Sequence, residues 1–432
     1  MGCPAHSREF FSWQEYYRAT IVRGSNYSPL HMRRIDLKDF QVATSETARD
    51  INRRIVLNLI RSHQPVSRAD LARHSGLQRS TVSVIAEQLI TEKWVKEGAI
   101  GHTVRGRRPR FLHLNKEHIG ILGVDIRPAI TTIALADVEG HFLSQETMET
   151  ARTPEVFLEH VGQRLRRMMK TRPGTSFEGI GVSLPGRLDL STQRLVFAPN
   201  LRWKDLELRA PLEQATGLSV ELENAANACA LAGVWFGRQT QGVANLIAIT
   251  VSEGIGAGLI LNHQLIQGST GLAGEFGHAA IVENGLLCSC GNHGCWEAYA
   301  SNTAAVRYYT ESASPARTVR PKRGPAAPAF ADVLRLAEEG DSRALEALKK
   351  MASYLGAGIA MLVTGLAPDV IMVVGEVTRM WEHVEPVLNE AVKSKSFTPA
   401  KTRILPSDPG QPRLLGAIAL VLQRHFGAPE VA

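Results

Sequence analysis

Apolar positions near the start of the chain recur with the period of an α-helix. The first pattern begins at Thr47 and ends before Pro65, because proline cannot continue a helix. Ser67 and Asp70 have the spacing of a capping box, which predicts a second, short helix that ends at Gly76. The apolar positions expected to share the inner face are Ile51, Ile55, Leu59 and Ile60 in the first helix and Val82, Ile85, Leu89 and Ile90 in a third.

Three short helices with a glycine-containing turn before the third predict a helix-turn-helix. A β-hairpin with an arginine-rich tip is expected to follow between Gly98 and Leu114, which makes the motif a winged helix. Such a loop is usually only solvated, but here it directly follows a helix whose first turns can reach phosphates and base edges in a major groove. The predicted DNA-binding residues are Gln78, Arg79, Ser80, Thr81 and Ser83 in the helix and Arg105, Arg107 and Arg108 in the wing.

From Ile119 onward, strand and helix patterns alternate. Two adjacent strands joined by a tight turn are followed by an amphipathic helix and a buried strand, and the strand and turn pattern then returns later in the chain. This is typical of a duplicated α/β fold with a cleft between two lobes. The segments concerned are 121–126 and 130–137, Pro154 to Lys170, the run GIGVSLPG, Leu246 to Val251 and Gly258 to Leu261.

The longest apolar stretch, Leu355 to Val374, has the length of a membrane span. Pro368 and Asp369 interrupt it, and the residues that follow are β-branched, so a buried helix and then a buried parallel strand are predicted instead. The N-terminus has no basic segment followed by an apolar core, so no signal peptide is expected. A soluble protein that does not bind a membrane is predicted.

Charge is unevenly distributed along the 432 residues. Ser45 to His118 contain fourteen Lys or Arg against seven Asp or Glu, so this span has a net charge of +7, which equals that of the whole chain. This asymmetry indicates a polyanion-binding module joined to a neutral part. The five cysteines form no disulfide framework, which favours the cytoplasm.

Three of those cysteines fall in one short segment with a histidine. Four soft or borderline ligands in such a segment are typical of a tetrahedral zinc site, and a full shell leaves no position for a reactive water, so a structural zinc is predicted. Buried free cysteines are the alternative, but Gly291 and Gly294 suit a loop that curls back on itself. The predicted ligands are His278, Cys288, Cys290 and Cys295.

The order Glu-x-Gly-His followed by Cys-x-Cys-Gly-x-x-Gly-Cys-x-Glu resembles the zinc-binding signature of the ROK family of repressors and sugar kinases. The resemblance implies an actin-like, ribonuclease-H-like sugar kinase fold over roughly residues 119 to 425, and sugar contacts by Glu275, His278 and Glu297. The run SRADLARHSGLQRSTVSVIAEQL, followed by GRRP, is similar to the DNA-binding half of ROK repressors. The family also commonly forms dimers, which implies a homodimer or homotetramer.

The kinase motifs of the family are altered in this chain. Asp125 to Ala129 read Asp-Ile-Arg-Pro-Ala where ROK kinases have an Asp-Ile-Gly-Gly-Thr phosphate turn, and proline offers no amide to a phosphate. A second glycine-rich turn, Ser252 to Gly256, keeps its glycines, but Glu253 places a carboxylate where a phosphate would approach. Ala225 occupies the position of the family's catalytic aspartate, whereas Asn224 is retained as a further sugar contact. We therefore expect a sugar site without catalysis.

These observations predict an α/β protein with an N-terminal winged helix-turn-helix and a two-lobed body. The expected function is a sugar-responsive regulator, most simply a repressor that a sugar releases from a double-stranded DNA operator. The alternatives are a sugar kinase that also binds DNA, and a repressor regulated by a protein partner. The predicted parts are an extension (residues 1–44), the DNA-binding domain (45–118), a first lobe (119–240) and a second lobe (241–428) that contains the zinc loop (278–295) and an insertion (311–329).

Overall fold

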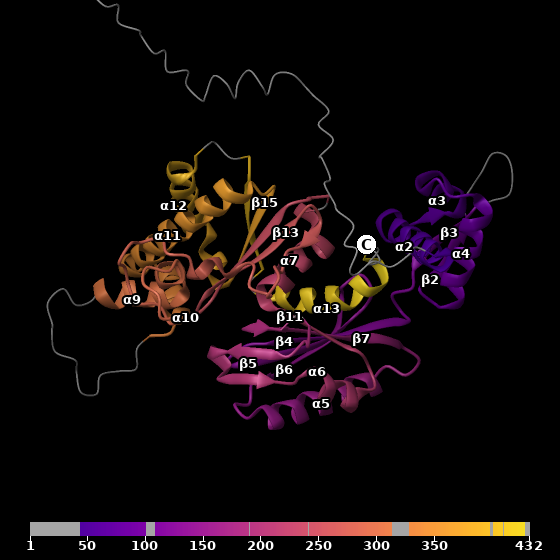
Figure 1. Cartoon of the computed structure of the whole chain (residues 1–432), viewed down its shortest axis with the longest axis horizontal. Coiled ribbons are helices and arrows are strands. Elements are labelled where there is room, and N and C mark those ends of the chain that lie inside the picture. The colour runs from indigo at the N-terminus through magenta and orange to yellow at the C-terminus, as the bar shows by residue number, and fades with distance from the viewer. Residues whose placement is uncertain are drawn as a thin grey trace, which may run out of the picture. The chain divides into compact units, whose positions relative to one another are not determined.

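The computed structural model describes seven segments of the chain (Figure 1). The predicted N-terminal extension up to residue 43, the wing arginines Arg105, Arg107 and Arg108, and most of the predicted insertion lie outside them. Asp50–Ala428 form one compact unit. The described segments are residues 44–100, 109–189, 191–240, 242–312, 328–397, 401–408 and 410–427.

The first elements form a winged helix-turn-helix, as the apolar pattern predicts. Three helices pack with a small sheet in which β3 lies between β1 and β2, and β1 lies between the first two helices in the chain. The third helix buries Val82, Ile85 and Leu89, in agreement with the prediction. The elements are α2 (Ser45–His63), β1 (Val66–Ser67), α3 (Arg68–Ser75), α4 (Arg79–Thr91), β2 (Val95–Ile100) and β3 (Arg110–Leu114).

Local hydrogen bonds explain where α3 begins and ends. The Ser67 side chain accepts a hydrogen bond from the Asp70 amide, and the Asp70 carboxylate accepts one from the Ser67 amide, so the predicted capping box is confirmed. Gly76 then ends the helix in a left-handed conformation. One detail of α2 differs from the prediction. Its core residues are Val56, Leu57 and Ile60, whereas Ile55 is 38% exposed, because packing against the body selects a face one residue further round the helix.

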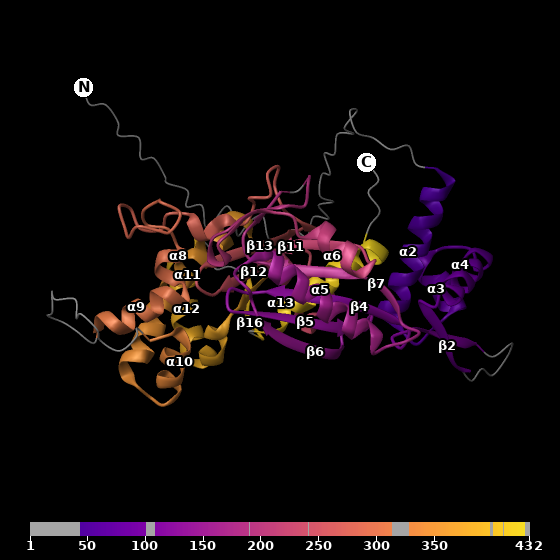
Figure 2. The same cartoon turned by 90° about the horizontal axis from the view of Figure 1, so that it is seen from below.

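The first lobe is a mixed five-stranded sheet in the order β11-β7-β4-β5-β6. Figure 1 shows α13 (Gln411–Phe426) on one face of this sheet and α5 and α6 on the other, and Figure 2 shows the same elements from below. The elements are β4 (Ile119–Ile126), β5 (Ile130–Ala136), β6 (Phe142–Glu149), α5 (Pro154–Lys170), β7 (Ser176–Leu184), β8 (Arg187–Leu188), β9 (Leu195–Ala198), η1 (Pro199–Leu201), β10 (Trp203–Leu206), α6 (Arg209–Thr216), β11 (Val220–Asn224), α7 (Ala225–Phe236) and η2 (Arg238–Thr240).

The second lobe repeats this topology. Its sheet has the order β14-β13-β12-β15-β16, with the same sequence of antiparallel and parallel pairs, which confirms the predicted duplication. The elements are β12 (Leu246–Val251), β13 (Ile255–Leu261), β14 (Gln264–Leu265), η3 (Glu275–His278), α8 (Glu297–Ala300), α9 (Asn302–Ser312), α10 (Phe330–Glu338), α11 (Ser342–Leu366), β15 (Val370–Val374), η4 (Glu376–Met380), α12 (Trp381–Lys395) and β16 (Arg403–Ser407), after which the chain returns to the first lobe as α13.

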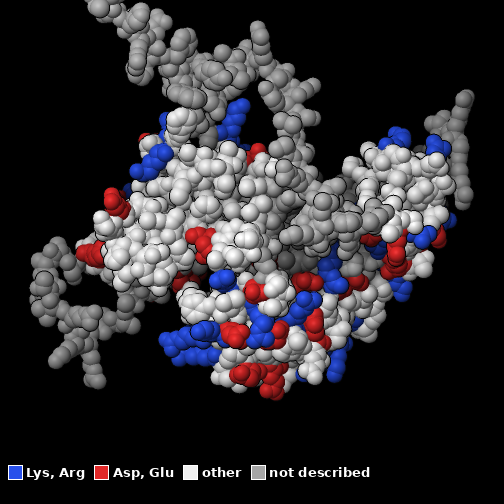
Figure 3. All heavy atoms as spheres, viewed as in Figure 1, with Lys and Arg blue, Asp and Glu red and all other residues white. Residues whose placement is uncertain are grey.

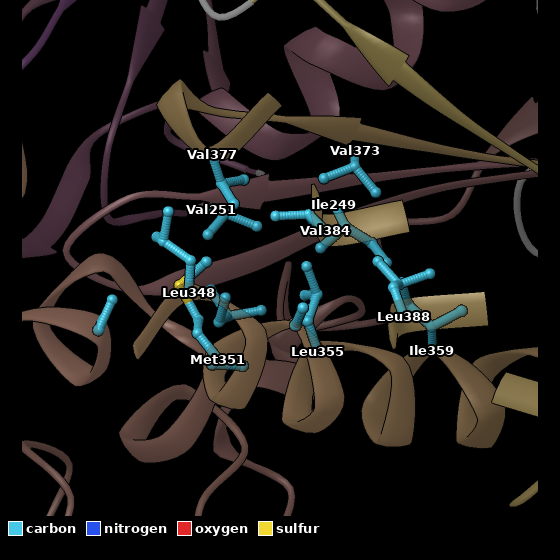
Figure 4. Packing of buried hydrophobic residues seen from close by; sticks show 14 of the residues in the cluster. Ile249, Val251, Leu348, Met351, Leu355, Ile359, Val373, Val377, Val384 and Leu388 are labelled. Atoms are coloured by element: carbon cyan, nitrogen blue, oxygen red, sulfur yellow. The ribbon is translucent and has the colours of Figure 1, made fainter. Parts of the chain in front are cut away.

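The long apolar stretch near the C-terminus builds the core of the second lobe. As predicted, it divides into the end of α11 and the buried strand β15, which pairs in parallel with β12. Figure 4 shows Leu348, Met351, Leu355 and Ile359 of α11 directed toward the strands, at the spacing of one helical face. Among the helices described, none is long and apolar enough to cross a membrane.

Candidate functional site

The loop that precedes α8 brings the four predicted metal ligands together. Nδ1 of His278 lies 3.6 Å from Sγ of Cys288, and Sγ of Cys290 lies 3.7 Å from Sγ of Cys295. All four donor atoms lie within 4.8 Å of one another. In a tetrahedral site with Zn–S bonds of about 2.3 Å and Zn–N bonds of about 2.0 Å, neighbouring donors are about 3.5 to 3.8 Å apart. The donor set therefore fits zinc in both chemistry and spacing.

Backbone geometry and one buried side chain hold this loop in place. Gly294 has φ +78°, and a Cβ there would lie 1.8 Å from the Val282 carbonyl oxygen, so only glycine fits. This agrees with the predicted tight return of the loop. Trp296 is fully buried in the second-lobe core and donates its Nε1 hydrogen to the Tyr354 carbonyl. The metal ligands are thus fixed to the lobe on the side of α11.

The thiols differ in their environments. Burial raises the pKa of Cys295 to about 12, whereas a hydrogen bond from the Asn292 amide lowers the pKa of the exposed Cys290. Three thiolates at this spacing repel one another, and a divalent cation between them offsets the repulsion. With four protein ligands the metal has no open position, which suits a structural role. Zinc binding itself stays a prediction.

Three of the four predicted sugar contacts lie around the start of β13 in the second lobe. The Glu297 carboxylate accepts a hydrogen bond of 3.0 Å from the Ile255 amide through Oε2. Nε2 of His278 lies 3.9 Å from Oε2 of Glu275, whereas its Nδ1 faces the cysteines. The imidazole ring of His278 therefore lies between the cysteines and the half-exposed carboxylate of Glu275.

Asn224, the fourth predicted contact, has a structural role in the first lobe. Its Oδ1 accepts a hydrogen bond from the Ala226 amide and caps α7, and its Nδ2 donates to the Gly186 carbonyl, both at 2.8 Å. One N–H and one lone pair of the amide remain for a ligand. The start of α7 reaches the second lobe, because a Cβ at Gly258 of β13 would lie 2.2 Å from the Ala226 carbonyl oxygen.

Sequence reasoning missed Glu223, which connects the two lobes. This buried carboxylate accepts hydrogen bonds from the Asn224 amide, from Asn227 Nδ2 and, at 2.7 Å, from Nε2 of Gln267 in the second lobe. Burial raises its pKa, and the three donors oppose that shift. The only signal in the sequence is its position directly before Asn224 and Ala225, which the resemblance had singled out. Its partner Gln267 lies 44 residues away and has no such signal.

Arg127 lies in the turn between β4 and β5, for which the resemblance predicts loss of phosphate binding. Its Nε donates a hydrogen bond of 2.7 Å to Oδ2 of Asp125, a carboxylate whose side chain is 1% exposed. Its Nη2 donates to the Gly410 carbonyl, just before α13. In the second glycine turn, the Ile255 amide is already bonded to Glu297. Protein groups thus satisfy donors and acceptors that could otherwise serve a nucleotide and its metal.

The predicted DNA-reading residues lie at the start of α4. Gln78 is the N-cap residue, and its side chain makes no capping hydrogen bond. Arg79, Ser80 and Ser83 are exposed, Thr81 is half-buried, and the Ser83 hydroxyl donates to the Arg79 carbonyl. The surface of the first lobe has acidic and basic side chains interspersed (Figure 3).

An ion-pair network that the sequence did not reveal joins the helices to the wing. Arg68, the first residue of α3, donates to Glu97 of β2 at 2.7 Å and lies 3.2 Å from Glu87 of α4. Arg110 at the start of β3 donates to the same Glu97 carboxylate at 2.6 Å. These hydrogen bonds, that from Arg110 foremost, lower the pKa of Glu97. The network lines a groove between α3, α4 and the wing.

The end of α13 joins the body to the DNA-binding domain. Arg54 and Asn58 of α2 donate hydrogen bonds of 2.8 Å to the carbonyls of Gly427 and Phe426, which lie at the end of α13. The Arg61 guanidinium stacks 4.6 Å from the Trp235 ring centroid, and burial lowers its pKa. Because α13 also packs against α7 and β7, one helix touches both the winged-helix elements and the helix that Asn224 caps.

Comparison with known proteins defines the class of the chain. Residues 121–424 match the model of the ROK family, and the chain belongs to this family. It is 31% identical to the xylose repressor of Bacillus subtilis (strain 168) over 395 residues, which cover 89% of this chain and 98% of that protein.

Two solved structures give the same result. A ROK family transcriptional regulator, described as a homolog of the E. coli MLC protein, superposes with a TM-score of 0.75 at 25% identity and covers 88% of this chain and 97% of its own. A ROK family glucokinase from Streptomyces griseus, in complex with glucose and AMPPNP, has a TM-score of 0.62 at 30% identity and covers 70% of this chain and 99% of its own. The fold prediction is confirmed.

Proposed function

We propose that this chain is a sugar-responsive transcriptional repressor without kinase activity. The winged helix binds an operator in double-stranded DNA, and a sugar bound to the body releases it. A structural zinc held by His278 and the three cysteines fixes the loop that presents His278 and Glu297 to the sugar. The repressor acts as a homodimer or homotetramer, because paired operator half-sites require paired winged helices.

The observation that best supports this proposal is the Arg127–Asp125 ion pair. A nucleotide needs backbone amides for its phosphates and a carboxylate free to hold Mg²⁺ through water. Here the carboxylate is bonded to a guanidinium within the same turn, and Pro128 removes an amide. Ala225 moreover supplies no general base, whose loss typically costs about 100- to 10,000-fold in rate. The relatives agree, because full-length similarity extends to a repressor and a regulator, whereas the glucokinase lacks a counterpart to 30% of the chain.

The proposed sugar site contains an amide, two carboxylates and an imidazole, from Asn224, Glu275, Glu297 and His278. This set can hydrogen-bond several hydroxyls of one pyranose, and the two carboxylates favour an uncharged sugar over a phosphorylated one. A sugar that draws the lobes together changes DNA affinity only through its different affinity for the two body conformations, commonly by about 1 to 3 kcal/mol. The contacts of α13 with both α7 and α2 provide a physical connection for this coupling.

The proposal can be tested with one purified protein. A duplex that the protein prefers is first selected from a random library, and its affinity is measured by fluorescence anisotropy with and without a panel of neutral sugars and sugar phosphates. We expect one neutral sugar to weaken operator binding by about 5- to 150-fold. Under the same conditions, ATP-dependent phosphorylation of these sugars should be absent.

Glu275→Gln and Glu297→Gln should keep operator binding but lose the sugar response. Glu283→Gln is the matched control, because Glu283 is an exposed carboxylate of the same loop. Sugar turnover that co-purifies with the protein would contradict the absence of kinase activity. A normal sugar response in both Glu variants would show that the effector binds elsewhere.

A further inference from the structure

One residue on the outer face of α4 has no structural explanation. Val84 is 60% exposed, whereas the neighbouring apolar residues Val82, Ile85 and Leu89 are at most 4% exposed and pack in the core. Single exposed apolar residues are normal on protein surfaces. The position of Val84, on the helix proposed to enter the DNA groove, is what makes it informative.

Val84 lies among the side chains that face outward from α4. Ser80 is three residues before Ser83 and four residues before Val84, so both side chains neighbour Ser80 on one helical face. Ser83 and Glu87 line the groove that Arg68 closes at the start of α3. Arg68 is paired with Glu87 and Glu97, so the positive charge on this side comes from Arg79 and from the net charge of +7 of residues 45–118. The expected occupant of this surface is therefore a nucleic acid.

In the major groove, the C5-methyl of thymine is the apolar group that an aliphatic side chain can recognise. Beside the polar edge of another base, a valine would displace water without replacing its hydrogen bonds, which is unfavourable. We propose that Val84 packs against a thymine methyl in each operator half-site and so contributes to sequence specificity. This inference rests on the proposed DNA-binding function, and it adds an apolar contact to the polar residues at the start of α4.

The proposal separates binding from folding. Alanine has a higher helix propensity than valine, and an exposed valine buries little apolar surface, so Val84→Ala should not lower the unfolding temperature. It should nevertheless weaken operator binding. A contact of one methyl group with an apolar surface corresponds to about a fourfold change in affinity.

Deoxyuridine provides the matching change in the DNA, because it lacks the C5-methyl but keeps the hydrogen-bonding edge of thymine. Each thymine of the selected duplex is replaced by deoxyuridine in turn, and the affinities of the wild type and of Val84→Ala are measured. At one thymine per half-site, the wild type should lose about fourfold, and Val84→Ala should show no difference between the two bases. Ile55→Ala is the control, because Ile55 is an exposed apolar residue of α2 and should keep the discrimination.

The outcomes distinguish this inference from the function on which it rests. If the wild type selects no preferred duplex, the DNA-binding function and this inference both fail. If it selects a duplex but no thymine is sensitive to loss of its methyl, the contact is refuted while the function stands. The same holds if Val84→Ala discriminates thymine from deoxyuridine as the wild type does.

Discussion

Replacement of Arg127 by alanine tests whether the turn between β4 and β5 has exchanged phosphate binding for an internal ion pair. The Arg127 guanidinium is the partner of Oδ2 of Asp125, and Oδ1 of this buried carboxylate has no hydrogen-bond partner among the described residues. The variant would therefore leave a buried carboxylate unpaired. Such a change typically costs about 3 to 5 kcal/mol.

Solvent access reduces that cost. The Arg127 side chain is 34% exposed, so water can enter when it is removed, and we expect Arg127→Ala to lower the free energy of unfolding by about 2 to 3 kcal/mol. Asp125→Asn should cost only about 1 kcal/mol, because the guanidinium left behind can be hydrated. The double variant should be more stable than Arg127→Ala, since it has no unpaired charge.

Urea denaturation followed by tryptophan fluorescence measures these differences. Arg335→Ala is the control, because Arg335 pairs with Glu339 on an exposed helix face and its loss should cost less than about 1 kcal/mol. If Arg127→Ala costs no more than this control, or if the double variant is the least stable, the reasoning about the turn is wrong.

Two further predictions concern the metal and pH. Cys290→Ser should contain no zinc in elemental analysis and should unfold at a lower temperature, because metal-binding free energy of about 10 kcal/mol or more contributes to folding. Cys229→Ala is the control: Cys229 lies outside the cluster, so this variant should keep the zinc. Zinc-free wild-type protein that is insensitive to chelators would contradict this. Burial lowers the pKa of His425 to about 4. The neutral histidine therefore stabilises the folded state fully above about pH 6.5, and this stabilisation is lost as the pH falls toward 4. Glu178 lies 3.4 Å from His425, and burial raises the pKa of its carboxyl. The pH dependence is therefore the reverse of that of the histidine: the stabilisation from Glu178 is present at low pH and is lost as the pH rises above about 4.5. Wild type should therefore lose more stability than His425→Gln between pH 7 and pH 5, and identical pH profiles of unfolding would exclude the histidine as the cause.

The sequence by itself determined the features that depend on neighbouring residues. The capping box at Ser67 and Asp70, the limits of α5 and the division of the long apolar stretch into helix and strand follow from local hydrogen bonding and periodicity. The zinc ligands are likewise close in sequence, within residues 278–295, so their types and spacing predicted a common centre. Repetition of one strand pattern also predicted two similar lobes.

Contacts between distant segments were decided only by the tertiary structure. Glu223 meets Gln267 across the two lobes, and Arg54 meets the carbonyl of Gly427, which is 373 residues away. No local pattern identifies such pairs, because each side chain alone has the properties of an ordinary surface residue.

Dependence on distant contacts also explains why the helical period did not predict the exposure of two apolar side chains. The periodicity predicts that Ile55 faces the core and gives no indication for Val84, whereas both side chains are exposed in the structure. A helical period shows that apolar residues share a face, but the elements packed against the helix decide which face is buried. The positions that remain exposed, and thus available to a ligand, are known only once that packing is known.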